Sequence, residues 1–180
     1  LTDFFFFVAE RLPFPDKSFD VVVSSHVLEH LPSFEAGWRE LCRVSRKRIV
    51  VALPTGFNLC ALALLGGDYG YWSLSKRSLW AIPWGFLRTL INLRGEGVQE
   101  GYAGKDELPH IWRFPWVLKR RLRHPEWRVV SYQASTLCLP YFPILLPFVA
   151  WLDRFRGAPV LRYLGYGSTL VFEKSKIENK

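Results

Sequence analysis

Three side chains able to move protons or hold a metal follow one another closely in this sequence: His26, Glu29 and His30. On a helix, residues at i, i+3 and i+4 share one face, so the spacing predicts that the three groups converge. Imidazole titrates near neutral pH, which makes His26 or His30 a candidate general base. With His110 as a distant fourth group, the same set would suit a transition metal better than Mg²⁺. We expect the general base and no metal.

A strand and a helix must position these residues. Residues 19–25 (FDVVVSS) form a nearly continuous β-branched run, which is typical of a parallel strand covered on both faces. A helix with Ser33 as its N-cap is predicted to reach Val44, because its apolar residues repeat at helical spacing. Residues 48–53 (RIVVAL) form the next buried strand, which Pro54 stops. This order predicts a βαβ unit in a parallel sheet with a right-handed crossover.

The ends of the two strands are the places to look for a ligand. In an open α/β sheet, ligands bind off the carboxyl ends of the strands. Ser24, Ser25 and His26 stand at the first of these ends, and residues 54–57 follow the second. The alternative for the two serines is simple strand termination.

The middle of the chain has a looser pattern. Residues 55–109 are rich in glycine and tryptophan, and we expect an insertion or lid whose aromatic side chains line a pocket. Helices are predicted at residues 59–65, 84–93 and 115–123. Strands are predicted at residues 127–132 and 169–173. We expect one domain over residues 1–174 and a polar tail over residues 175–180.

Composition bounds the class of protein. The chain has 180 residues, of which 49% are hydrophobic and 16% aromatic, which excludes a disordered chain. The formal net charge is +8, with a basic cluster at residues 119–123 that could meet nucleic acid, anionic lipid or a phosphorylated substrate. A solvated helix face is the alternative for this cluster.

The cysteines and the apolar stretches indicate in which cellular compartment the protein works. Cys42, Cys60 and Cys138 are widely spaced without CxxC pairing, so we expect reduced, buried thiols of an intracellular protein. No signal peptide is visible at the start. The apolar stretch at residues 137–152 is shorter than the roughly 18–20 residues of a spanning helix and predicts a buried or membrane-surface hairpin.

Residues 9–22 (AERLPFPDKSFDVV) strongly resemble the class I S-adenosylmethionine-dependent methyltransferases. More narrowly, they resemble the type 11 group, which contains the methyltransferases of quinone biosynthesis. The resemblance continues through residues 24–31 (SSHVLEHL), 40–44 (ELCRV) and 110–114 (HIWRF).

The resemblance implies an α/β fold, the Rossmann-like class I methyltransferase sheet of seven strands, with the helical and aromatic insertion placed after strand five. Residues 19–25 would be strand four and residues 48–53 strand five. Residues 127–132 would be strand six and residues 169–173 the antiparallel strand seven. The first three strands would precede Leu1, together with the glycine-rich cofactor loop and the acid that holds the ribose. We therefore expect an incomplete domain whose N-terminal strands are missing.

S-adenosylmethionine is the cofactor that the resemblance implies. Its adenine would lie near Ala9, Glu10 and Arg11, and its methionine moiety near Ser24, Ser25 and His26. Val8 stands where relatives usually have an Asp that accepts from the adenine amino group.

A metal at this site is a second implication of the resemblance. Some relatives hold a divalent metal with an ExxEH pattern and a downstream His, and His26 replaces the first Glu of that pattern here. Most members of the type 11 group use the residues matching Glu29 and His30 to orient the loop without metal.

The expected function is methyl transfer from S-adenosylmethionine to a small or lipid-like acceptor, such as a quinone precursor, a lipid or a lipid-linked sugar. We expect a cytoplasmic protein with peripheral membrane contact. The alternative is a non-catalytic remnant that acts as a membrane-surface or partner-binding module. A nucleic-acid methyltransferase is supported only by the charge, so nucleic acid is not the expected partner.

Overall fold

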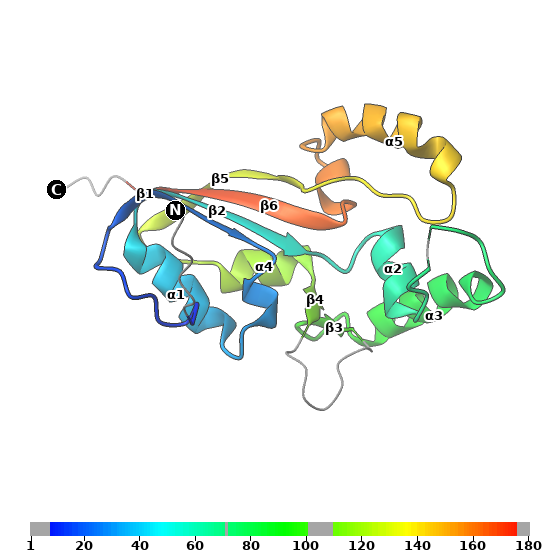
Figure 1. Cartoon of the computed structure of the whole chain (residues 1–180), viewed down its shortest axis with the longest axis horizontal. Helices are drawn as coiled ribbons and strands as arrows, with labels where there is room; N and C mark the ends of the chain where they lie inside the picture. Colours follow the sequence, from blue (N-terminus) through cyan, green and yellow to red (C-terminus); the bar gives the residue numbers. More distant parts are fainter. Residues whose placement is uncertain (1–7, 71, 101–109, 176–180) are drawn as a thin grey trace, which may run out of the picture.

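A four-stranded sheet forms the centre of the computed structural model, which describes residues 8–70, 72–100 and 110–175. The strand order is β1-β2-β6-β5 (Figure 1). The strands are β1 (Phe19–Ser25), β2 (Ser45–Pro54), β5 (Trp127–Ala134) and β6 (Gly167–Lys174). β1 pairs with β2 in parallel, and β6 runs antiparallel to both of its neighbours. All four predicted strands are confirmed, including the antiparallel last one.

Helix α1 (Phe34–Val44) completes the predicted βαβ unit. The Ser33 side chain accepts a hydrogen bond from the Ala36 N–H at 3.2 Å, which is the expected N-cap. The helix buries one apolar face against the sheet, where the ring centroid of Trp38 lies 4.7 Å from that of Phe172 in β6. The core cluster joins α1, β2 and β6. Its members from α1 are Phe34, Trp38, Leu41 and Cys42.

Within the described residues, β1 is an edge strand of the sheet. Val21 and Val23 are 52% and 66% exposed. The expectation that this strand is covered on both faces is therefore wrong for the described structure, because no described element packs over these side chains. Ser24, by contrast, is buried.

Beyond the end of β2, the chain forms a second body of short elements. These are α2 (Leu59–Leu65), α3 (Ser78–Ile91), the small antiparallel pair β3 (Gly97–Gln99) and β4 (Ile111–Arg113), and α4 (Pro115–Arg121). α2 has the predicted bounds. α3 begins at Ser78 rather than residue 84, because Ser75 and Ser78 exchange side-chain to backbone hydrogen bonds that start the helix before Pro83. The strands β3 and β4 were not predicted.

After β5 the chain runs out along α2 and returns through short helices to β6. We call residues 137–152 the apolar arm. Its return contains η2 (Pro143–Leu145) and α5 (Leu146–Leu152), followed by η3 (Asp153–Phe155) and η4 (Leu161–Tyr163). In Figure 1 the arm stands beside α2 and α3 at one end of the molecule. The arm is an exposed segment and not a buried hairpin, since Val149 is the only residue of α5 that is buried.

The arm is tied to α2 by a disulfide between Cys60 and Cys138, whose Cα atoms lie 6.3 Å apart. The prediction of three reduced thiols is wrong for this pair. The two residues are 78 positions apart, and only the path of the arm across α2 brings them together. Cys42 is the free, buried thiol that was expected, and burial raises its pKa to about 12.

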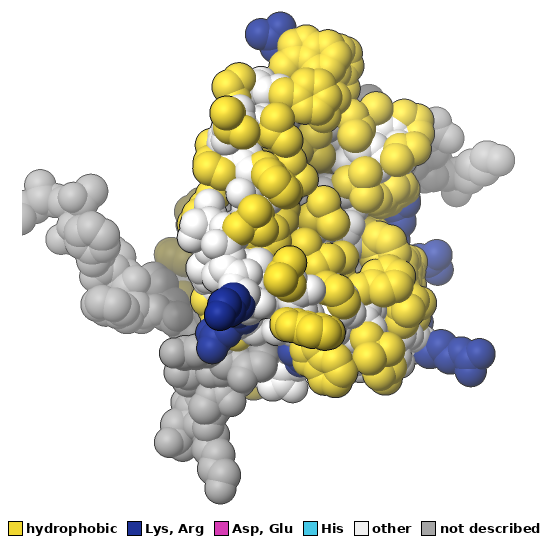
Figure 2. Space-filling model, turned by 90° about the vertical axis from the view of Figure 1, so that its right-hand side faces the viewer, with side chains coloured by type: hydrophobic (Ala, Val, Ile, Leu, Met, Phe, Trp, Pro, Cys, Tyr) yellow, Lys and Arg dark blue, Asp and Glu magenta, His cyan; other side chains and the backbone are white. Residues whose placement is uncertain are grey.

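Large apolar side chains crowd the surface at the end of the molecule where α3 and the arm lie (Figure 2). No helix in the described ranges is both long and apolar enough to cross a membrane.

Candidate active site

The carboxyl end of β1 carries an unusual backbone conformation. His26 has a φ of 52°, in the left-handed region that residues other than glycine seldom adopt. Its N–H donates to the Ala52 carbonyl of β2 at 3.0 Å, so the turn is fixed to the sheet. Strained positions of this kind cluster at functional sites.

The left-handed turn, and not a helix, makes the predicted side chains converge. The helical element is a single 3-10 turn, η1 (Leu28–His30), and His26 precedes it. The Nδ1 atom of His26 lies 3.2 Å from Oε1 of Glu29. The convergence of these two residues was predicted, but the helical spacing used to predict it was the wrong reason.

Glu29 is a buried carboxylate. Its side chain is 1% exposed, whereas that of His26 is 42% exposed. Neither oxygen of Glu29 accepts a hydrogen bond within the described part of the chain. The imidazole of His26 is the side chain that contacts Oε1, so the two residues form a pair. The pair thus presents one ring edge of His26 to the surface and holds the other at the carboxylate.

His30 and His110 form a second part of the site. Their ring centroids lie 4.6 Å apart, although the residues are 80 positions apart in the chain. Ligand atoms of Glu29, His30 and His110 all lie within 4.8 Å of one another, close enough to share a metal ion. His110 was predicted as the distant partner, and the structure brings it to this place.

Two residues of the site were missed by the sequence interpretation. Glu100 accepts from Nδ1 of His110 at 2.6 Å and from the Trp112 indole N–H at 2.9 Å. The hydrogen bond from His110 lowers the pKa of Glu100 below its ordinary value of 4.5. Arg113 lies over the Phe34 ring at 4.3 Å, and its burial lowers its pKa. Both belong to the pair β3–β4 or its margin, which no local pattern announces.

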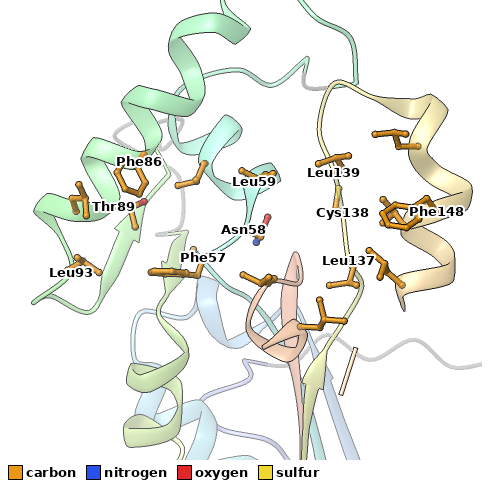
Figure 3. A pocket seen from close by; sticks show the side chains of 18 residues that line it. Phe57, Asn58, Leu59, Phe86, Thr89, Leu93, Leu137, Cys138, Leu139 and Phe148 are labelled. Atoms are coloured by element: carbon orange, nitrogen blue, oxygen red, sulfur yellow. The ribbon is translucent and has the colours of Figure 1, made fainter. Parts of the chain in front are cut away.

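An apolar pocket of about 450 Å³ opens where β2 ends (Figure 3). Its walls come from three places: the residues that follow β2, one side of α3, and the arm with α5. The labelled lining residues are Phe57, Asn58, Leu59, Phe86, Thr89, Leu93, Leu137, Cys138, Leu139 and Phe148.

The hydrogen-bonding side chains of this pocket are already satisfied. Asn58 donates to the carbonyls of Thr55 and Gly165 at 2.8 and 2.9 Å and caps α2 through the Ala61 N–H. Thr89 donates to the Gly85 carbonyl at 2.8 Å. The remaining walls are aliphatic or aromatic, apart from Cys138 of the disulfide and the backbone of Gly56. The pocket therefore suits an apolar group and offers it no spare polar side chain.

The predicted cofactor residues do not form one cluster. Ala9 and Ser24 line a smaller pocket of about 240 Å³ beside β1, whose other walls are apolar. Such walls fit a flat ring such as adenine. Glu10 is engaged elsewhere, since its Oε1 accepts from the Ser33 N–H at 2.6 Å at the start of α1. Arg11 and Ser25 are exposed.

The basic cluster on α4 is largely paired within the chain. Arg120 and Arg121 both contact Glu96, at 2.9 Å each, and Lys119 donates to the Tyr163 hydroxyl at 2.8 Å. These contacts favour the interpretation as an ordinary solvated helix face.

Comparisons with known proteins agree with this fold. Residues 3–53 match the family model Methyltransf_11, described as a methyltransferase domain. No curated protein matches the chain. A SAM-dependent methyltransferase from Thermotoga maritima is 11% identical, with a TM-score of 0.51, over 93% of this chain and 61% of its own. A Listeria monocytogenes protein described as an S-adenosylmethionine-dependent methyltransferase is 14% identical, with a TM-score of 0.51, over 93% of this chain and 67% of its own.

The fold is thus the Rossmann-like fold of the class I S-adenosylmethionine-dependent methyltransferases. The matched segment, which takes in β1, α1 and most of β2, is consistent with the type 11 group that the sequence motifs indicated. The chain spans 61% of the length of the first of these structures, and its fold resembles theirs.

Proposed function

We propose that the chain takes part in methyl transfer from S-adenosylmethionine to a lipid-like acceptor that carries a weakly nucleophilic O–H or N–H group. One observation carries this proposal. The His26–Glu29 pair stands at the carboxyl end of β1, and the apolar pocket opens at the carboxyl end of β2. The carboxyl ends of adjacent parallel strands lie on the side where α/β folds bind their ligands.

The proposed step is an in-line displacement at carbon. S-adenosylmethionine, when bound, supplies an electrophilic methyl group. His26 would accept the acceptor's proton at Nε2 as the acceptor atom takes the methyl group from the cofactor's sulfur. Glu29 would position the imidazole through its 3.2 Å contact with Nδ1, which leaves Nε2 as the nitrogen that faces the acceptor. The neighbouring His30 is the second candidate base.

The cofactor would lie along the end of β1. Ala9 and Ser24 fit the adenine side, and Ser25 and His26 would face the methionine side. Glu10 and Arg11, which the resemblance also implicates, would contribute through their backbone, since the Glu10 carboxylate is already bound to the start of α1.

The test is His26→Asn in the full-length protein. Asn tolerates the left-handed backbone at this position but cannot act as a base. We expect kcat to fall by about 10²- to 10⁴-fold with KM little changed, measured as transfer of labelled methyl groups to alkylated phenols. Arg39→Asn, on the exposed face of α1, is the matched control. A loss of less than about three-fold with His26→Asn would overturn the role of His26.

The same residues give a second candidate role, as ligands of a divalent metal. The observation that favours it is the buried Glu29 carboxylate, whose oxygens lie within 4.8 Å of ligand atoms of His30 and His110. Metal content of the purified protein, with Glu29→Gln as the control, distinguishes this role from proton transfer. Loss of bound metal in Glu29→Gln together with loss of activity after chelation would favour the metal.

A non-catalytic role is the alternative to the whole proposal. Titration calorimetry of the full-length protein with S-adenosylmethionine separates the two. Absence of binding would favour a membrane-surface or partner-binding module over an enzyme.

A further inference from the structure

Helix α3 has its small residues inside and its large apolar residues outside. The residues that it buries are Ser78, Ala81, Gly85 and Thr89. Outward, Trp80 is 77% exposed, Ile91 72% and Trp84 55%. A surface helix in water buries its large apolar side chains and exposes polar ones. The reverse arrangement indicates that the outer face of α3 meets something apolar.

The small inner residues let α3 approach α2 closely. A Cβ atom added to Gly85 would lie 1.9 Å from the Leu62 carbonyl oxygen, and one added to Gly66 would lie 1.8 Å from that of Ala81. Large side chains are therefore excluded from this interface, and α3 can place them only outward.

The arm presents a second apolar surface of the same kind. Ile144 is 85% exposed, Phe148 56% and Trp151 50%. Residues 137–152 contain no charged side chain at all. The first charge after them, Asp153, is used within the arm, where it accepts from the Leu137 N–H at 2.9 Å.

Two cross-links hold the arm and α3 in a fixed relation. The first is the disulfide between Cys60 and Cys138. The second is the buried carboxylate of Asp68, which accepts from the Ser78 hydroxyl at 2.8 Å and from the Tyr141 hydroxyl at 3.1 Å. The two apolar surfaces thus form one face, and the apolar pocket lies between them.

The exposed charged side chains next to α3 and α5 are cationic. Residues 76–94, which contain α3, include four cationic side chains and no carboxylate. Lys76, Arg77 and Arg94 are exposed, and so is Arg154 beyond α5. Figure 2 shows Lys and Arg at the margin of the apolar face and no acidic side chain among the described residues visible there.

This pattern selects among possible occupants of the face. A second copy of the chain would bring like charges together at the rim, which opposes association. An anionic lipid surface would attract the same cations while accepting the tryptophans at its headgroup level.

We propose that the outer face of α3 and the arm docks on an anionic bilayer, and that the pocket between them takes the hydrocarbon part of the acceptor directly from that bilayer. The first statement stands without the methyltransferase activity. The second rests on the proposed function and names the acceptor class as a membrane lipid, since the pocket offers only apolar walls to its ligand.

Vesicle sedimentation of the purified full-length protein tests the docking. Vesicles of phosphatidylcholine mixed with phosphatidylglycerol should bind it at least about ten-fold better than phosphatidylcholine alone, with the difference screened by salt. Brominated lipids should quench the tryptophan fluorescence of the bound protein. Equal binding to both kinds of vesicle, or binding to neither, would overturn the proposal.

Paired substitutions locate the surface. Trp80→Glu and Ile144→Glu should each lower vesicle binding by about ten-fold or more, because each puts a charge into the apolar interface. Val129→Glu, an exposed position on the edge strand β5, should leave binding unchanged. Both face positions are more than three-quarters exposed, so these variants should retain the circular dichroism of the wild type. Vesicle binding unaffected by either face variant would refute this surface, and a dimer dissolved by Trp80→Glu would assign the face to a second copy.

The two proposals fail separately. Vesicle binding without methyl transfer in any lipid would leave the docking face and remove the proposed function. Turnover of a detergent-dispersed alkylated phenol without vesicle binding would leave the proposed function and remove the docking face.

Discussion

Helices α1 and α3 follow opposite rules within one chain. α1 buries Trp38, which is 3% exposed, against the sheet, while α3 leaves Trp80 77% exposed and buries Gly85 and Thr89. α1 separates apolar residues from polar ones, whereas α3 separates small residues from large apolar ones. The sheet-bound helix is arranged for water on its outer side, and α3 is arranged for an apolar medium there. The contrast divides the molecule into a region built around its own core and a region whose apolar surface faces outward.

The largest expected effect on the free energy of unfolding comes from replacing a tryptophan by alanine in each of the two regions. Trp38→Ala should lower the free energy of unfolding by about 3–5 kcal/mol, because it leaves a cavity in the core. Trp80→Ala should change it by less than about 0.5 kcal/mol, since the indole is mostly in solvent. Denaturant unfolding of both variants measures the difference. Equal losses would show that Trp80 is covered by another part of the protein in solution.

The disulfide is the next test, because it fixes the outward-facing region alone. Replacing both Cys60 and Cys138 by Ser should lower the free energy of unfolding by about 2–4 kcal/mol, as expected for a bridge that closes a long loop. The substitution should also loosen the wall of the pocket and raise the KM for alkylated acceptors. Cys42→Ser, in the sheet region, is the control, because it replaces a thiol by a hydroxyl without breaking a disulfide. An unchanged KM would mean that the hydrogen bonds of Asp68 suffice to hold the arm.

A single methyl group should disturb the interface between α2 and α3. Gly85→Ala places its Cβ against the Leu62 carbonyl and should cost about 1–3 kcal/mol through overpacking. Gly157→Ala is the matched change, since a Cβ there meets no atom within 4 Å. Thermal unfolding of the two variants compares them. A stabilised Gly85→Ala would show that α3 shifts freely on α2.

The smallest expected effect is on how the free energy of unfolding depends on pH. The pocket lining holds no titratable side chain, whereas Glu100 of the candidate active site has a pKa lowered by His110. A carboxyl whose pKa is lowered by folding adds stability above its unfolded pKa near 4.5 and loses it as the pH falls through the folded value. The advantage of the wild type over Glu100→Gln should therefore shrink between about pH 6 and pH 3 in urea unfolding. An advantage that grows on acidification would contradict the ion pair.

Local pattern was sufficient for the sheet region. The β-branched runs, the Ser33 cap and the helical spacing of α1 all lie within short windows, and the four strands were found at nearly their true bounds. Helix α2 was found as well, because Asn58 and the apolar run after it are local signals. The start of α3 was missed, because the helix begins at Ser78, where Ser75 and Ser78 exchange hydrogen bonds.

The candidate active site was predicted only in part, because it depends on contacts between separate segments and not on local sequence patterns. His26, Glu29 and His30 were visible as a cluster, but the backbone turn that joins them depends on a hydrogen bond to β2. Arg113 lies within the motif at residues 110–114, but Glu100 enters only through the pairing of β3 with β4, which the sequence analysis did not predict. The bond between Cys60 and Cys138 was missed for the same reason, because it follows from the path of the arm.

The close approach at Gly66 and Gly85 has a consequence for how this chain can vary. In most proteins packing restricts which residues can occupy the large apolar positions, and the small surface positions vary freely. On α3 the order is inverted: the inner side toward α2 admits only small residues, while Leu79, Trp80 and Ile91 need only remain large and apolar. Among homologues, substitutions on the outer side of the helix should therefore exchange one large apolar residue for another. The glycine, alanine and serine on the inner side should be conserved.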